Sequence, residues 1–140
     1  MNQEKLNEIL RLHELWLTNS PEGIRANLEK ADLEGVDLRG ASLEGVNLSE
    51  ANLREADLER AYLCGACLCK ADLRGVNLKG AYLERANLKE ANLQGADLRG
   101  ANLYKADFQG ANLYKTNLQG ANLYGVNLQG DIMNRNKANI

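Results

Sequence analysis

The run ANLEK ADLEG VDLRG, at residues 26–40, contains three copies of one five-residue pattern. The pattern continues without a break to VNLQG at residues 126–130, so that 105 residues form 21 repeats. Its third position is Leu in 20 repeats and Phe108 in the other, its first is Ala in 16, and its second is Asn in 11 and Asp in six. Such self-similarity at a fixed period is typical of a repeat protein.

A five-residue period argues against both a continuous α-helix and a flat strand. On a helix, successive leucines would rotate by about 140° and spread over every face. On a strand, the first and third positions share one side, but an odd period sends the next Leu to the opposite side. Every Leu stays inside only if the chain turns a corner once per repeat. Gly at the fifth position and Asn or Asp at the second suit such corners. The pattern therefore predicts a solenoid with Leu along its axis.

Charged and aromatic residues indicate how many repeats close one coil. At an offset of four repeats, two series of opposite charges and two pairs of tyrosines come into register: Lys30–Glu50–Lys70–Glu90, Arg39–Glu59–Lys79, Tyr62–Tyr82 and Tyr104–Tyr124. Stacked strands lie about 4.8 Å apart, where such pairs stabilise a sheet. The like charges of Arg54 and Arg74 also coincide, so four repeats per coil is favoured only modestly by this reasoning.

The A-[D/N]-L-x-x repeat resembles that of the pentapeptide-repeat proteins over residues 26–130, three quarters of the chain. The resemblance implies an all-β solenoid, a right-handed quadrilateral β-helix with four repeats per coil, in agreement with the charge series. The 21 repeats then make about five coils and a rod roughly 25 Å long. We expect residues 1–25 to form an N-terminal helical cap, residues 26–130 the β-helix, and residues 131–140 a C-terminal tail.

Residues 3–18 carry a stripe at helical spacing, four apolar side chains and one His: Leu6, Ile9, Leu10, His13 and Leu17. The sequence NSPEG at residues 19–23 would end this helix. We interpret it as an amphipathic lid over the first coil, whose axial leucines would otherwise meet water; a helix that binds a partner is the alternative. The runs LHELWL at 12–17 and GIRA at 23–26 also resemble the leader of many cyanobacterial-type family members.

The C-terminal end is less protected, because the pattern fails at residues 131–133. The last ten residues could fold over the final coil with Ile132, Met133 and Ile140, or the end could stay open. An open apolar coil end favours end-on association. We therefore expect either a monomer or an end-on homodimer.

Composition and charge exclude several functional classes. The net charge of −2, from 17 basic and 19 acidic residues, argues against a polybasic protein that binds nucleic acid directly. No apolar run of about 18 residues is available for a membrane span, and the N-terminus lacks the features of a signal peptide. Three cysteines, an odd number, disfavour a secreted disulfide framework. We expect a cytoplasmic protein.

The sequence CGACLC at residues 64–69 is the one local cluster that could carry chemistry. The register places Cys64 and Cys69 at fourth positions and Cys67 at a second position, so all three should point outward. Free surface thiols with possible redox activity are favoured; a disulfide, for example between Cys64 and Cys67, and a metal site are the alternatives. A thiolate metal site would lack a fourth ligand, since His13 is the one His and belongs to the cap. We expect no metal and no cofactor.

The repeat itself explains the regular Asp and Gly positions, so they do not indicate catalysis or phosphate binding. Tyr104 and Tyr124 share one face and are candidate partner contacts, because Tyr is enriched in interface hot spots; a solvated cross-strand pair is the alternative. Loops, which usually carry chemistry, are nearly missing. We therefore expect a non-enzymatic scaffold that binds an unidentified protein partner.

The resemblance also implies an alternative function, because some pentapeptide-repeat proteins imitate duplex DNA and modulate DNA gyrase or other type II topoisomerases. Such mimicry needs dense and continuous negative charge. Residues 26–130 hold 14 acidic and 12 basic residues, so their net charge is 12 − 14 = −2. This mixed surface favours the scaffold over the DNA mimic.

Overall fold

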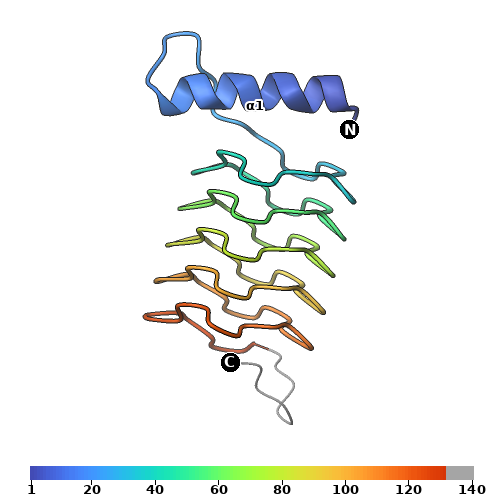
Figure 1. Cartoon of the computed structure of the whole chain (residues 1–140), viewed down its shortest axis with the longest axis vertical. Coiled ribbons are helices and arrows are strands. Elements are labelled where there is room, and N and C mark those ends of the chain that lie inside the picture. Colours follow the sequence, from blue (N-terminus) through green and yellow to red (C-terminus); the bar gives the residue numbers. More distant parts are fainter. Residues whose placement is uncertain (132–140) are drawn as a thin grey trace.

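The computed structural model describes residues 1–131, which form a helix followed by a stack of coils (Figure 1). The helix, α1, spans Gln3–Leu17 and is the one helix in this part of the chain. Asn2 caps its N-terminus, because its side-chain oxygen accepts a hydrogen bond from the Lys5 N–H. Figure 1 shows α1 lying across the N-terminal end of the stack, from which the chain descends coil by coil.

Each repeat turns a corner at its fourth and fifth residues. In the first repeat the Ala31 N–H donates to the Leu28 carbonyl at 3.1 Å, and Lys30, at the third place of this four-residue turn, has a φ of 57°. All fifth positions have positive φ, in twelve glycines and nine other residues. A positive φ at that place alone is typical of a type II turn. This turn is why Gly is frequent at the fifth position.

Successive coils are joined by parallel bridges between second positions of repeats that lie four apart along the chain, from Asn27–Asn47 to Asp107–Asn127. In the middle of the stack, the Leu68 N–H donates to the Asn87 carbonyl at 2.7 Å, and the Asn87 N–H donates to the Ala66 carbonyl at 2.9 Å. One coil therefore contains four repeats. The register predicted from the charge series is the register of the structure.

The coil differs in one respect from the expected all-β solenoid. Within residues 27–127 the pairing consists of isolated bridges rather than extended strands. Each repeat contributes one bridging residue between two corners, because a turn in every five residues leaves no length for a longer ladder. The architecture is a four-cornered coil of bridges and turns with a helix at its N-terminal end.

The core is a column of side chains along the axis of the coil. Third-position leucines and first-position alanines are fully buried in the middle coils, as Leu68 and Ala66 illustrate with 0% exposure each. Phe108 takes a third position and is 1% exposed. In the last described coil Leu123 and Leu128 are only partly buried. The second, fourth and fifth positions therefore supply the molecular surface.

One face of α1 packs on the first coil. Leu6 and His13 are buried, and Ile9 and Leu10 are partly buried against the core. These are four of the five positions that the apolar spacing predicts for a lid. None of the helical segments among residues 1–131 is long and apolar enough to cross a membrane.

The prediction for the C-terminal end concerns residues that the structure does not describe. Ile132, Met133 and Ile140, which would cover the last coil in one of the two alternatives, lie outside the described residues. The choice between a covered end and an end-on homodimer stays a prediction.

Candidate interaction face

The four-repeat register sorts the outward side chains onto four faces. One face consists of repeats 41–45, 61–65, 81–85, 101–105 and 121–125, aligned by the bridges Ser42–Tyr62, Tyr62–Tyr82, Tyr82–Asn102 and Asn102–Asn122. It carries four of the five tyrosines of the chain: Tyr62, Tyr82, Tyr104 and Tyr124. We call this surface the aromatic face. Tyr114 lies two repeats further along the coil, on the opposite face.

The four tyrosines form two stacked pairs. The ring centroids of Tyr62 and Tyr82 lie 4.9 Å apart with an interplanar angle of 3°, and those of Tyr104 and Tyr124 lie 5.7 Å apart with an angle of 7°. Both pairs were predicted from the four-repeat offset. Tyr124 is 72% exposed and Tyr62 is 43% exposed, so one ring of each pair is available to a partner, while Tyr104 is partly buried.

Sequence reasoning proposed Tyr104 and Tyr124 as partner contacts but did not join Tyr62 and Tyr82 to the same surface. The signal was available, because all four residues fall in repeats that are separated by whole coils. Tyr62 and Tyr82 occupy second positions of their repeats, whereas Tyr104 and Tyr124 occupy fourth positions. This difference made it less evident that all four lie on one face.

Cationic side chains surround the Tyr104 ring. The Lys105 Nζ lies 5.1 Å from the ring centroid, and the Arg85 guanidinium carbon lies 5.9 Å from it, distances at which a cation is attracted to an aromatic face. Glu84 is engaged elsewhere, since its Oε1 accepts from the Asn102 side-chain amide at 2.6 Å. The C-terminal half of the aromatic face, around Tyr104, therefore also carries local positive charge.

The cap extends this surface at its N-terminal end. The Trp16 ring is 39% exposed and lies against Gly45, the fifth residue of the first repeat on the aromatic face. Arg25 connects the two, because its Nε donates to the Gly45 carbonyl at 2.6 Å while its guanidinium lies 5.9 Å from the Trp16 centroid. Sequence reasoning assigned Trp16 only to the N-terminal helical cap, since periodicity does not predict where a helix docks.

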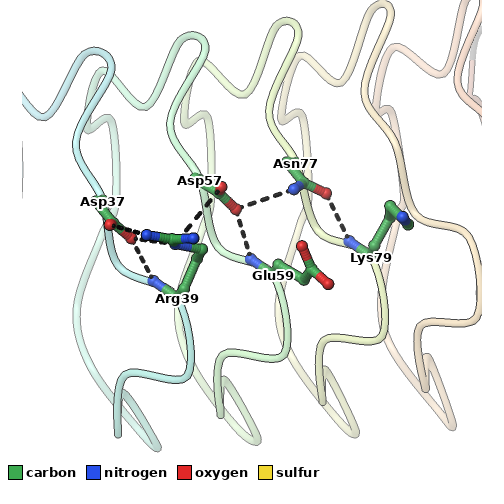
Figure 2. Close-up of polar contacts among 6 residues, drawn as sticks. All are labelled: Asp37, Arg39, Asp57, Glu59, Asn77 and Lys79. Atoms are coloured by element: carbon green, nitrogen blue, oxygen red, sulfur yellow. Dashed lines mark hydrogen bonds and ion pairs between the residues drawn. The ribbon is translucent and has the colours of Figure 1, made fainter.

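A neighbouring face, built from repeats such as 36–40 and 56–60, shows how the coil accommodates stacked carboxylates. Asp37 and Asp57 occupy bridged positions, and Arg39 contacts both, at 2.7 Å from Asp37 Oδ2 and 3.9 Å from Asp57 Oδ2. Hydrogen bonds from the Arg39 side chain and N–H hold the pKa of Asp37 at about 2. Figure 2 shows Arg39 turned towards these two carboxylates, and Asn77 continuing the ladder by donating to Asp57 Oδ1 at 2.9 Å.

The predicted charge series are found in part. The fifth-position pairs Lys30–Glu50 and Lys70–Glu90 have Nζ to Oε2 distances of 3.9 and 3.8 Å. In the fourth-position series, by contrast, Arg39 pairs with Asp37 of its own repeat rather than with Glu59 (Figure 2). A carboxylate two residues away on the same repeat is closer than a side chain on the next coil, so Arg39 pairs with Asp37 instead of Glu59.

The three cysteines lie on two faces and are all half-buried free thiols. The Cys67 and Cys69 sulfurs are 3.1 Å apart. The Cys64 thiol instead donates to Glu84 Oε2 at 2.9 Å, and burial together with this hydrogen bond raises its pKa to about 11. The structure thus pairs Cys67 with Cys69, whereas the disulfide considered from the sequence joined Cys64 to Cys67. Residues 1–131 hold no group of three or more His, Cys, Asp or Glu side chains arranged for a metal ion.

The stacked coils and this surface define a solenoid repeat protein that presents flat faces of stacked side chains. A family model described as pentapeptide repeats matches residues 24–60, 56–95, 66–103 and 91–130, with 8 copies of the repeat. The chain therefore belongs to the pentapeptide-repeat family, whose members fold as right-handed β-helices.

Solved structures of other pentapeptide-repeat proteins are similar to this chain. A protein from the Arabidopsis thaliana thylakoid lumen is 31% identical, with 66% of this chain and 65% of that chain covered and a TM-score of 0.64. Rfr23 from the cyanobacterium Cyanothece 51142 is 29% identical, with 94% and 97% covered and a TM-score of 0.51. The fluoroquinolone resistance protein QnrB1 is 24% identical, with 81% and 65% covered and a TM-score of 0.51, and supports the fold alone. None of the curated proteins matches the chain significantly.

Proposed function

We propose that this protein is a non-enzymatic scaffold that binds a protein partner through the aromatic face. The supporting observation is the gathering of Tyr62, Tyr82, Tyr104, Tyr124 and Trp16 along one side of the rod. Tyr and Trp are enriched in interface hot spots, because they bury a large area while few rotatable bonds lose freedom. A rigid coil holds these rings in place before binding, which reduces the entropic cost of association.

Tyr104 and Tyr124 are the proposed centre of the contact. Tyr124 is the most exposed of the exposed large hydrophobic residues, at 72%. Lys105 and Arg85 lie beside the Tyr104 ring and favour a partner that offers carboxylates next to an apolar patch, since complementary charges orient an encounter.

The test compares partner capture by three forms of the protein: the natural chain, the double variant Tyr104→Ser/Tyr124→Ser, and Tyr114→Ser as the control on another face. We expect the double variant to bind the captured protein about 30-fold more weakly, because truncating a hot spot costs about 2 kcal/mol. The control should bind as the natural chain does. Equal binding by the double variant would contradict the assignment, provided that circular dichroism shows unchanged folding.

The alternative function, a DNA mimic that modulates gyrase, requires continuous negative charge. Basic side chains interrupt the described faces, with Arg85 and Lys105 on the aromatic face and Arg39 between Asp37 and Asp57 on its neighbour. A gyrase supercoiling assay with the protein titrated in, with and without quinolone, separates the two functions. We expect no effect at micromolar protein; inhibition or protection would favour the DNA mimic over the scaffold.

The remaining expectations belong to the same proposal. The odd number of cysteines supports a cytoplasmic location, and the mixed surface charge supports a protein partner rather than direct nucleic-acid binding. The partial exposure of Leu123 and Leu128 is compatible with either a monomer or an end-on homodimer. Sedimentation at several concentrations distinguishes the two.

A further inference from the structure

The Cys67 sulfur occupies a place that an amide or carboxylate oxygen occupies in most repeats. In the preceding coil of this face, Asn47 Oδ1 accepts the N–H of Ser49 at 3.1 Å, and in the following coil Asn87 Oδ1 accepts the N–H of Lys89 at 3.1 Å. Cys67 stands at the equivalent position, and the backbone of Cys69 contributes to lowering the pKa of its thiol. The repeat therefore places this sulfur where the backbone helps to stabilise a thiolate.

The Cys69 sulfur lies next to it. The second and fourth positions of a repeat both point outward, so the side chains of Cys67 and Cys69 emerge side by side, with their sulfurs 3.1 Å apart. A disulfide bond measures about 2.05 Å, so a movement of about 1 Å brings the two sulfurs to bonding distance. Both thiols belong to one rigid corner of the coil, which keeps them together without a folding event.

Polar groups of the preceding coil surround Cys67 on its other side. The Ser49 hydroxyl lies 3.0 Å from the Cys67 sulfur and donates to Asn47 Oδ1 at 2.6 Å. Rotation of that hydroxyl would let it donate to a Cys67 thiolate instead. A shallow groove of about 420 Å³, lined by Arg25, Ala26, Asn27, Asn47, Ser49 and Cys67, opens beside this sulfur. A small disulfide can therefore approach Cys67 from the groove, with Arg25 available for an acidic group.

The two thiols differ in ionisation. Burial opposes ionisation of Cys67, but hydrogen bonds from Ser49 and Cys69 outweigh it and lower the pKa of the Cys67 thiol. Burial and the adjacent Cys67 sulfur raise the pKa of Cys69 to about 11. Since a thiolate is the attacking species in disulfide exchange, Cys67 is the first nucleophile and Cys69 is the resolving thiol.

We propose that Cys67 and Cys69 form a reversible dithiol–disulfide site that exchanges with small disulfides of the glutathione class. The Cys67 thiolate attacks one sulfur of the disulfide, a protein–small-thiol S–S bond forms as the small disulfide's S–S bond breaks, and the first small thiol leaves as a thiolate that then takes up a proton. Cys69 then loses its proton and attacks the Cys67 sulfur, which releases the second small thiol. The protein dithiol is oxidised by two electrons, and one small disulfide is reduced to two thiols.

This assignment is separate from partner binding, because the two thiols lie on the face next to the aromatic face. It is also distinct from metal binding. A structural zinc site takes four ligands, and no third His, Cys, Asp or Glu ligand joins this pair within the described part of the chain. Cys64 is held by Glu84 on the aromatic face and serves as the matched control.

The test uses the full-length protein, oxidised glutathione as the probe, and the variants Cys64→Ser, Cys67→Ser and Cys69→Ser. Each variant leaves one pair of cysteines, and a tryptic peptide of residues 61–70 contains all three positions. After timed exposure and blocking of free thiols, mass spectrometry separates the internal disulfide, which has lost two hydrogen atoms, from the glutathione adduct.

We expect Cys64→Ser to form the internal disulfide as readily as the natural chain, and at least about ten-fold faster than Cys67→Ser or Cys69→Ser, because only it retains the adjacent pair. Cys69→Ser should accumulate the glutathione adduct at Cys67. The proposal would be overturned if Cys64→Ser accumulated the adduct or stayed reduced, or if Cys69→Ser closed an internal disulfide equally fast. Disulfide-linked dimers on a non-reducing gel in place of the internal bond would also overturn it.

Discussion

At the residue scale, the fifth position of each repeat must adopt a backbone conformation that most residues avoid. Its φ is positive in every repeat, whether the residue is Gly or a charged side chain such as Lys30 or Glu90. For residues with a Cβ atom this backbone conformation is disfavoured by roughly 1–2 kcal/mol, and only Gly, Asn and Asp adopt it readily. The corner therefore tolerates nine non-glycine residues at a local cost, which the packed core offsets.

At Gly95 the cost of a positive φ can be measured separately from steric clashes. Its φ is 71°, and an added Cβ atom would meet nothing within 4 Å. We expect Gly95→Ala to lower the free energy of unfolding by about 1 kcal/mol through backbone strain alone, measured by urea denaturation. Gly95→Asn should lose less, because Asn adopts positive φ more easily. An equal or larger loss in Gly95→Asn would contradict positive φ as the cause of the loss.

At the scale of the element, one histidine joins α1 to the first coil. The His13 Nδ1 accepts a hydrogen bond from the Ala26 N–H at 3.0 Å, and its Nε2 lies 3.1 Å from the Glu44 carbonyl oxygen. Because the Ala26 N–H can only donate, Nδ1 carries no proton, so Nε2 carries it and donates to Glu44. Gly23 allows the returning chain to lie against the backbone of Trp16, which a Cβ atom would meet at 2.2 Å.

The stability of this joint should depend on pH. Burial lowers the pKa of His13 below its usual 6.5 and outweighs the hydrogen bond to Glu44, which raises it. The unfolded chain therefore binds a proton more readily than the folded one, and stability falls as the pH drops below about 6.5. Protonation at Nδ1 also removes the acceptor for the Ala26 N–H.

We expect hydrogen exchange at the Ala26 amide, corrected for its intrinsic pH dependence, to lose protection as the pH falls below about 6.5. Trp16 fluorescence should change over the same range. His13→Asn keeps an acceptor near the Nδ1 position but does not titrate, so its protection should not depend on pH in this range. If the natural chain and His13→Asn had the same pH profile, another group would control the joint.

At the scale of the whole molecule, stability comes from one continuous axial core rather than from separate elements. Each coil contacts the coils before and after it, so the stability of a solenoid is approximately a sum of repeats and their nearest-neighbour contacts. Leu83 lies in the middle of the column with 0% exposure. Leu123 holds the equivalent position two coils later and is only partly buried.

Truncation of these two leucines should therefore have unequal effects. We expect Leu83→Ala to lower the free energy of unfolding by about 2–5 kcal/mol, because it opens a cavity between two coils. Leu123→Ala should cost less than half as much, since less of its side chain leaves water on folding. Urea unfolding followed by circular dichroism measures both. Equal losses would show that the last coil is packed as tightly as the middle.

All three scales bear on how much of this protein follows from its amino-acid order. The five-residue period predicts the corners, the inward leucines and the four-repeat register, because these depend on backbone geometry that every repeat shares. The helical spacing of Leu6, Ile9, Leu10 and His13 predicts the side of α1 that faces the coil. These inferences succeed because local pattern and global fold demand the same arrangement.

The tertiary structure decided how individual side chains are paired. It joined Trp16 to the aromatic face through Gly45, turned Arg39 towards Asp37 and Asp57 instead of Glu59, and placed the Cys69 sulfur rather than that of Cys64 beside Cys67. The repeat specifies only where each Cα atom lies and in which direction its side chain leaves the backbone. The direction of a long side chain, or the docking of a helix, depends on competing contacts with neighbours in space, and those contacts exist only once the coils have stacked.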